Sequence, residues 1–88
     1  MIFDEPIDKS RLEQFASQVQ LLSPAFIEDL DRSFRKDQSP EFYKGLLTGS
    51  VNSYVMVHNK SPGSQEDQLL GALVAYVSDV ILKNEWYG

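Results

Sequence analysis

The chain has 88 residues, 42% of them hydrophobic and 24% charged, and its formal net charge is −5. This length permits one hydrophobic core, and the apolar fraction is typical of a folded domain rather than a disordered chain. The sequence contains no cysteine, which excludes disulfides and thiolate metal sites. The acidic balance disfavours binding to nucleic acid or to anionic membranes, because no basic stripe is present. We therefore expect a single acidic domain over residues 1–88.

Two features of the sequence bear on where the protein resides. Its first residues lack a basic segment followed by an apolar run, so they do not resemble a signal peptide. Its longest apolar segment, residues 69–82, contains Ser78 and Asp79 and is shorter than a membrane-spanning helix. We expect a soluble cytoplasmic protein without membrane contact. The stroma of an organelle is also compatible, if a transit peptide has been removed.

The first predicted helix spans residues 8–22. Its apolar side chains recur every three or four positions and so share one face, formed by Leu12, Phe15, Ala16, Val19 and Leu22. Asp8 is a suitable N-cap for this helix. Alternatively, Ser10 and Glu13 form a capping box two residues later.

The second predicted helix spans residues 23–36 and begins at Ser23-Pro24. Serine at the N-cap followed by proline is a strong helix start, because proline lacks an N–H that would be unpaired there. The apolar face consists of Phe26, Ile27, Leu30 and Phe34. Acidic residues lie in the early turns and basic residues in the late turns, which complements the helix dipole. We interpret this charge cluster as structural.

The third predicted helix spans residues 40–58 and begins at Ser39-Pro40, in the same way as the second. One broad face of this helix contains Phe42, Tyr43, Leu46, Leu47, Val51, Tyr54, Val55 and His58. The alternative is a break in this helix at residues 48–50. Residues 51–58, which are rich in β-forming residues, would then form a strand. We favour a continuous helix and keep the strand as the alternative.

The fourth predicted helix spans residues 65–84 and starts at Ser64, a favourable N-cap. Its apolar side chains cover a wide arc of the helix surface: Leu69, Leu70, Leu73, Val74, Tyr76, Val77, Val80 and Ile81. A strand over residues 69–77 is the alternative, although both of its faces would be apolar. Leu82 and Trp86 lie on the less apolar side. We therefore expect this helix to be either the central helix of the domain or part of a dimer interface.

These four segments predict an all-α fold, a small bundle of three or four helices. The alternative is an α+β fold with strands at 51–58 and 69–77. Two pairs of small residues four positions apart indicate where helices cross, namely Gly45 with Gly49 and Gly71 with Ala75. Glycine inside a helix costs about 0.5–1 kcal/mol relative to alanine, so close approach of two backbones would explain it. We expect the third and fourth helices to cross at these residues.

The residues needed for catalysis are scarce. Without cysteine, nucleophilic catalysis would need a serine with a histidine base, and His58 is the one histidine in the sequence. We interpret His58 as a packing residue near a helix end. The carboxylates match no metal-binding loop, and no glycine-rich phosphate loop is present. We therefore expect no enzymatic activity, no cofactor and no metal.

One stretch bears a resemblance to an enzyme family. Residues 54–58 and 69–76, read as two strands and followed by residues 80–88, are similar to the middle of the acetyl-CoA-dependent acetyltransferase fold. In that family a strand leads into a glycine-rich loop that binds the pyrophosphate of acetyl-CoA. The sequence ends where this loop would begin. The resemblance therefore implies a truncated acetyltransferase-like α/β domain as an alternative function.

The hydrophobic C-terminal end favours a role in interaction. Trp86 and Tyr87 are large aromatic residues, a class enriched at interface anchors. Trp86 either folds back to close the bundle or, with Tyr87 and Leu82, contacts a partner. We expect a protein-interaction or regulatory module that acts by apolar helix docking, with another protein or a second copy as partner. A scaffold subunit of a larger complex is a further alternative.

Overall fold

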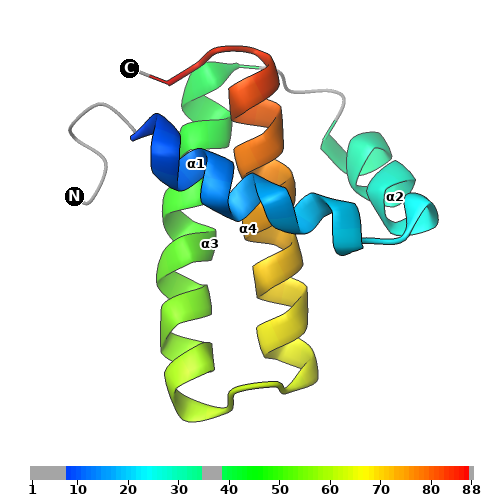
Figure 1. Ribbon diagram of the computed structural model, residues 1–88, viewed down its shortest axis with the longest axis vertical. Coiled ribbons are helices and arrows are strands. Elements are labelled where there is room, and N and C mark those ends of the chain that lie inside the picture. The colour runs from blue at the N-terminus through cyan, green and yellow to red at the C-terminus, as the bar shows by residue number, and fades with distance from the viewer. Residues whose placement is uncertain (1–7, 35–38, 88) are drawn as a thin grey trace.

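The computed structural model describes residues 8–34 and 39–87, and these form four α-helices and one 3-10 helix. The elements in chain order are α1 (Lys9–Ala16), η1 (Ser17–Leu21), α2 (Pro24–Phe34), α3 (Pro40–Lys60) and α4 (Gln65–Lys83). Figure 1 shows α3 and α4 as a long antiparallel hairpin, with α1 crossing over both and α2 beside α4. The predicted all-α bundle is confirmed. None of the helices in the described ranges is long and apolar enough to cross a membrane.

The alternative α+β fold is wrong, because both proposed strands lie inside helices. Residues 51–58 belong to α3 and residues 69–77 belong to α4. The helical period places Val74, Val77 and Ile81 on one buried stripe. A strand would divide the same residues between two faces, so burial of the stripe overrides the local β-propensity. The two strands on which the acetyltransferase interpretation depends are thus absent from the described residues.

The predicted serine and aspartate caps are present at all four helix starts. The side-chain oxygens of Asp8, Ser23, Ser39 and Ser64 accept hydrogen bonds from the backbone N–H groups of Ser10, Phe26, Phe42 and Asp67, at 2.9 to 3.2 Å. Asp8 therefore caps the first helix, and the alternative start at Ser10 is wrong. Each cap satisfies a backbone donor that has no partner within its helix, worth about 1 kcal/mol.

The helix ends differ from the prediction in detail. The first helix tightens after Ala16 into η1, a 3-10 segment that ends at Leu21. Helix α3 continues two residues beyond the predicted end, to Lys60. The residue with left-handed geometry in the following turn is Gly63, with φ 82°. The predicted last turn of the second helix, residues 35–36, lies outside the described residues.

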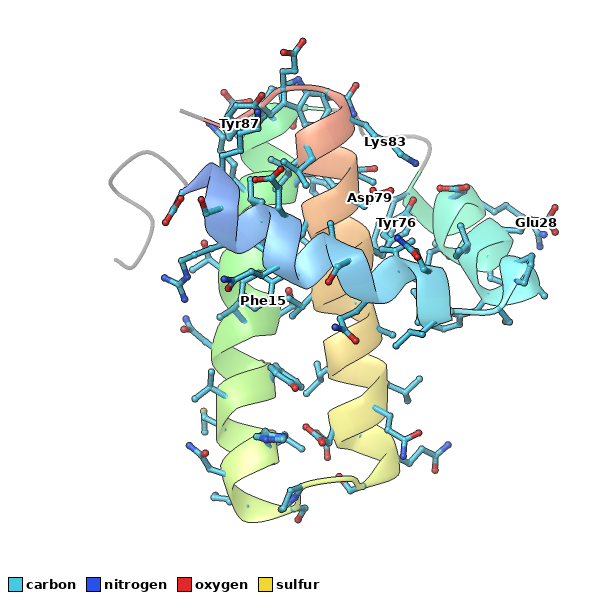
Figure 2. All side chains as sticks on the ribbon, viewed as in Figure 1. Phe15, Glu28, Tyr76, Asp79, Lys83 and Tyr87 are labelled. Atoms are coloured by element: carbon cyan, nitrogen blue, oxygen red, sulfur yellow. The ribbon has the colours of Figure 1, made fainter. Side chains whose placement is uncertain are left out.

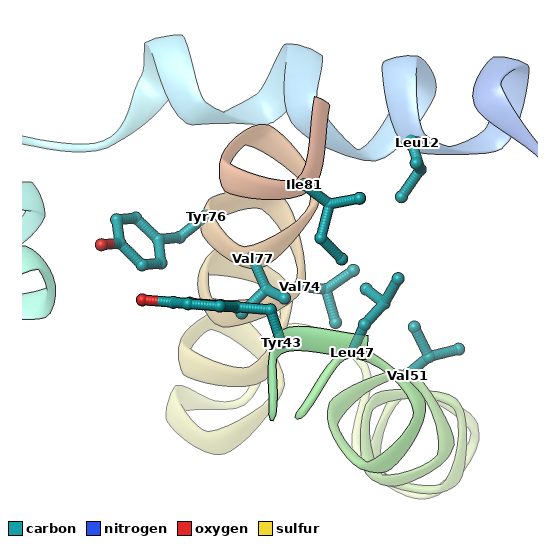
Figure 3. Close-up of a cluster of buried hydrophobic side chains, with 8 residues drawn as sticks. All are labelled: Leu12, Tyr43, Leu47, Val51, Val74, Tyr76, Val77 and Ile81. Atoms are coloured by element: carbon teal, nitrogen blue, oxygen red, sulfur yellow. The ribbon is translucent and has the colours of Figure 1, made fainter. Parts of the chain in front are cut away.

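The hydrophobic core lies between α1, α3 and α4 (Figure 3). It consists of Leu12 from α1, Tyr43, Leu47 and Val51 from α3, and Val74, Tyr76, Val77 and Ile81 from α4. Helix α4 also buries Ala75 and Ser78, so it is covered by α3 on one side and by α1 and η1 on another. Of the two predicted roles for this helix, the structure shows the first: α4 is the central helix of the domain.

The predicted helix crossing is only half right. Gly45 and Gly49 are exposed, and apart from their chain neighbours and the nearby backbone of α3 itself, no atom lies within 4 Å of where a Cβ would be. At 100° per residue, both lie roughly opposite Leu47, which faces α4. Gly71 does meet α3, because a Cβ there would lie 3.2 Å from Cε1 of Tyr54. Ala75 is buried one turn further along α4. Close approach therefore depends on Gly71, and the prediction for Gly45 and Gly49 is wrong.

Candidate functional site

The C-terminal turn places Trp86 against the bundle. Glu85 adopts a left-handed conformation, with φ 55°. The N–H of Trp86 donates to the carbonyl of Ile81 at 3.0 Å, and the N–H of Glu85 donates to that of Leu82 at 3.1 Å. These two bonds form a Schellman motif, which satisfies the last carbonyls of α4 and reverses the chain. The aromatic residue that follows is thereby directed back toward the helix end.

The three residues predicted to bind a partner make contacts within the chain. The ring of Trp86 lies 5.6 Å from that of Tyr43 and packs, half-buried, on the core. Leu82 is likewise half-buried against the core. Lys9 Nζ lies 5.3 Å from the centre of the Tyr87 ring, close to the start of α1 (Figure 2). Of the two alternatives left open for Trp86, the structure shows the residue folded back on the bundle.

An aromatic cluster joins α2 to the rest of the bundle. Phe34 of α2 stacks on Tyr76 of α4 with ring centres 6.1 Å apart. The Tyr76 hydroxyl donates to Oδ1 of Asp31 at 2.5 Å, and the Tyr43 hydroxyl donates to the carbonyl of Phe34 at 3.2 Å. Burial and the neighbouring Asp31 carboxylate raise the pKa of Tyr76, because both disfavour a phenolate. The hydroxyl therefore stays protonated and keeps donating.

A pocket of about 610 Å³ lies beside this cluster, between α2, α4 and the C-terminal turn. Its aromatic lining comes from Tyr43, Tyr76 and Trp86, and its charged lining from Glu28, Asp31 and Arg32. Figure 2 shows Tyr76 on the side of α4 that faces α2. The pocket thus combines apolar ring surface with carboxylates.

A polar cluster closes the other end of the α3–α4 hairpin. Asp67 accepts from the N–H of Gly63 at 2.8 Å and lies 3.1 Å from Nδ1 of His58. The hydrogen bond from Gly63 lowers the pKa of Asp67, burial opposes this, and His58 adds to the lowering. The expected packing role for His58 therefore takes the form of a contact between the end of α3 and the start of α4.

A groove runs between the first helical segment and the first half of α4. We call it the α1–α4 groove; it has a volume of about 720 Å³. Phe15, Leu21 and Leu22 line it from α1, η1 and the residue that follows, and Gly71 and Ala72 line it from α4. Phe15 appears below α1 in Figure 2, toward the closed end of the hairpin. Leu21 is 80% exposed, the largest exposure among the large hydrophobic residues described.

The rim of the α1–α4 groove is polar and nearly neutral. Gln14, Gln18 and Gln68 line it with uncharged amides, and Asp67 is its one acidic residue. The small side chain of Ala72 lets another backbone approach closely there, while the amides offer hydrogen bonds. Nowhere in residues 8–34 and 39–87 do three or more histidine or carboxylate residues gather closely enough to hold a metal ion.

Neither concave site is predicted from the sequence. Leu21 is a large hydrophobic residue that lies outside the apolar stripe of the first helix. In the sequence, this position off the stripe indicates an exposed contact residue. The pocket joins Asp31 to Tyr76, 45 positions apart in the chain, and nothing local indicates such a pairing. No known protein family, curated protein or solved structure matches the chain.

Proposed function

We propose that the protein is a helical interaction module that binds an amphipathic helix of a partner protein in the α1–α4 groove. The exposure of Leu21 carries this proposal, since a large aliphatic side chain that is 80% exposed beside a concave apolar surface is a typical contact residue. In this proposal the protein resides in the cytoplasm and acts without catalysis, cofactor or metal.

The shape of the groove favours a helix as the occupant. Ala72 presents little side-chain volume, so a helix can lie close to α4 there and bury its own apolar residues against Phe15 and Leu22. The amides of the rim can pair with polar residues beside that apolar stripe. Such docking buries Leu21, and full burial of a leucine side chain contributes about 1.5–3 kcal/mol.

Charge favours a different protein over a second copy as the occupant. The formal charge of −5 makes two copies repel each other at long range, particularly at low salt. The same charge attracts a helix with basic residues on its flanks. The proposed partner therefore has an apolar stripe bordered by lysine or arginine.

The role of Leu21 can be tested with a matched pair of substitutions. Leu21→Lys introduces a charge at the groove, and Leu69→Lys introduces the same charge at a 51%-exposed leucine of α4 that does not line it. Tagged wild type and both variants are incubated with an extract of the source cells, and retained proteins are quantified by mass spectrometry. We expect at least one protein to be retained by wild type and Leu69→Lys but lost from Leu21→Lys.

Two results would count against this proposal. If the three forms retain the same proteins, Leu21 does not contact a partner. If light scattering shows a wild-type dimer that Leu21→Lys converts to a monomer, the groove is occupied by a second copy. Circular dichroism of each variant checks that the helices are intact.

A scaffold subunit of a larger complex is the second candidate. Val55 and Met56 of α3 are 50% and 61% exposed, and Leu69 of α4 is 51% exposed, all outside the lining of the groove. A subunit contacted on several sides would use such residues as well as Leu21. In that case Met56→Lys and Leu69→Lys should each remove a different protein from the retained set.

A further inference from the structure

The pocket between α2 and α4 has the composition of a cation site. Its lining includes the Glu28 and Asp31 carboxylates, which lie one helical turn apart on α2. Its volume of about 610 Å³ falls within the usual range of small-molecule sites, roughly 300–1,000 Å³. It lies across α4 from the α1–α4 groove, and neither proposal depends on the other.

Within residues 8–34 and 39–87, each of the two pocket carboxylates keeps an oxygen that accepts no hydrogen bond. Arg32, the one basic residue in the lining, lies 3.5 Å from Asp29, which is not part of the lining. Glu28 has no ion pair with any described residue. Oδ1 of Asp31 accepts a hydrogen bond from the Tyr76 hydroxyl, and no described residue donates to Oδ2. The lining therefore carries a net charge of −1, from two carboxylates and one guanidinium.

The aromatic residues determine which kind of cation fits. Tyr43 and Tyr76 are buried and form the inner part of the pocket, while the half-buried Trp86 lines it from the C-terminal turn. Metal ions such as Ca²⁺ and Mg²⁺ need a set of oxygen ligands that two carboxylates beside aromatic rings do not supply. A guanidinium group is planar and weakly hydrated, stacks on aromatic rings, and pairs with carboxylates through two parallel hydrogen bonds.

We propose that this pocket binds an organic cation through a guanidinium group, which contacts the Glu28 and Asp31 carboxylates and the ring of Trp86. The group can belong to an arginine side chain of another protein or to a small free molecule. Both sources present the same planar charge to the same residues. The Schellman motif at the end of α4 holds Trp86 in place for this contact.

Trp86 is the one tryptophan in the chain, so its fluorescence reports on the pocket directly. The purified protein is titrated with N-acetyl-arginine methylamide and, separately, with agmatine, and sodium chloride at equal ionic strength is the control. We expect a saturable change in Trp86 emission with at least one guanidinium compound and none with sodium chloride. Tighter binding of the arginine derivative points to a protein side chain, and tighter binding of agmatine points to a small free cation.

A matched pair of substitutions tests where the cation binds. Glu28→Gln removes one pocket carboxylate, and Glu66→Gln removes an exposed carboxylate in the first turn of α4, away from the pocket. We expect Glu28→Gln to weaken binding about 3- to 10-fold, because it removes one partly exposed charge at the site, and Glu66→Gln to leave binding within about 1.5-fold of wild type. The proposal is overturned if neither compound shows saturable binding, or if the two variants weaken binding equally.

Discussion

The hydroxyl of Tyr76 on α4 donates a 2.5 Å hydrogen bond to the Asp31 carboxylate on α2. Helix α2 has no fully buried residue, and its apolar side chains Ile27, Leu30 and Phe34 are only half-buried. Together with the hydrogen bond from the Tyr43 hydroxyl to the carbonyl of Phe34, this bond therefore contributes a large share of what positions α2. It also shapes the proposed cation pocket, because both residues line it.

Removing the Tyr76 hydroxyl should loosen α2. Hydrogen bonds to charged groups contribute roughly 1.5–3 kcal/mol, and exposure of Asp31 reduces this, so we expect Tyr76→Phe to lower the free energy of unfolding by about 1 kcal/mol. Amide hydrogen exchange in α2 should quicken more than in α3. Tyr54→Phe is the control, since its hydroxyl has no hydrogen bond to a described residue. Equal effects of both variants would contradict this role of the Asp31 bond.

The raised pKa of Tyr76 predicts a loss of stability in alkali. The unfolded chain releases the tyrosine proton near pH 10, whereas the folded protein retains it to higher pH. Stability from this group is thus complete below pH 10 and falls as the pH rises above it. Urea unfolding between pH 8 and about pH 11 measures this slope. We expect Tyr76→Phe to have a shallower slope than Tyr54→Phe; identical slopes would exclude Tyr76 as the cause.

The lowered pKa of Asp67 predicts a loss of stability in acid. Its contribution is present above the ordinary carboxyl pKa of 3.8 and is lost as the pH falls through the lower value of the folded state. Asp67→Asn should therefore flatten the dependence of the free energy of unfolding on pH below about 4. Asp29→Asn, at an exposed surface pair, is the control. If the free energy of unfolding of Asp67→Asn depends on pH as steeply as that of the wild type, other carboxylates dominate acid unfolding.

The left-handed conformation of Glu85 predicts a stabilising substitution. A side chain at positive φ costs roughly 1–2 kcal/mol, and the greater freedom of glycine in the unfolded chain offsets part of the gain. We expect Glu85→Gly to raise the free energy of unfolding by about 0.5–1 kcal/mol, as measured in urea. Asn84→Gly is the control, because Asn84 has φ −95°. A gain at Asn84 equal to that at Glu85 would rule out the conformational explanation.

The glycines of α3 and α4 should respond differently to alanine. Gly45 has open space at the Cβ position, so Gly45→Ala should stabilise the protein by about 0.5–1 kcal/mol through helix propensity. At Gly71 the same methyl group would lie 3.2 Å from the ring of Tyr54, and displacing the ring offsets that gain. Thermal unfolding of both variants checks this. An equal gain at Gly71 would show that the close approach to Tyr54 costs little.

The sequence contains most of the information on the helices and little on the concave sites. Ser23, Ser39 and Ser64 cap the helices as predicted, because capping is a local interaction within one turn. The hydrophobic period of α4 also identifies its buried residues. The four-residue spacing of Gly45 and Gly49 places them on one face of α3, but it does not show whether that face meets α4. The prediction for Gly45 was wrong for that reason.

Each of the two concave sites brings together residues that lie far apart in the sequence, and local sequence patterns do not predict such contacts. The α1–α4 groove exists because α1 crosses the hairpin partway along its length (Figure 1), which leaves Leu21 beside the first half of α4. The angle of that crossing follows from side-chain packing among three helices. For Trp86, the signal of the Schellman motif was hidden, because the left-handed residue is glutamate rather than glycine.

Photo-crosslinking from the α1–α4 groove tests the proposed docking most directly. A benzophenone amino acid is placed at position 21 or, as the control, at position 69, and the protein is irradiated in an extract of the source cells. We predict that position 21 forms an adduct with a different protein, mapping to an amphipathic helix with basic flanks, and that position 69 does not. Adducts of equal yield from both positions, or adducts with a second copy alone, would contradict binding of a partner helix in this groove.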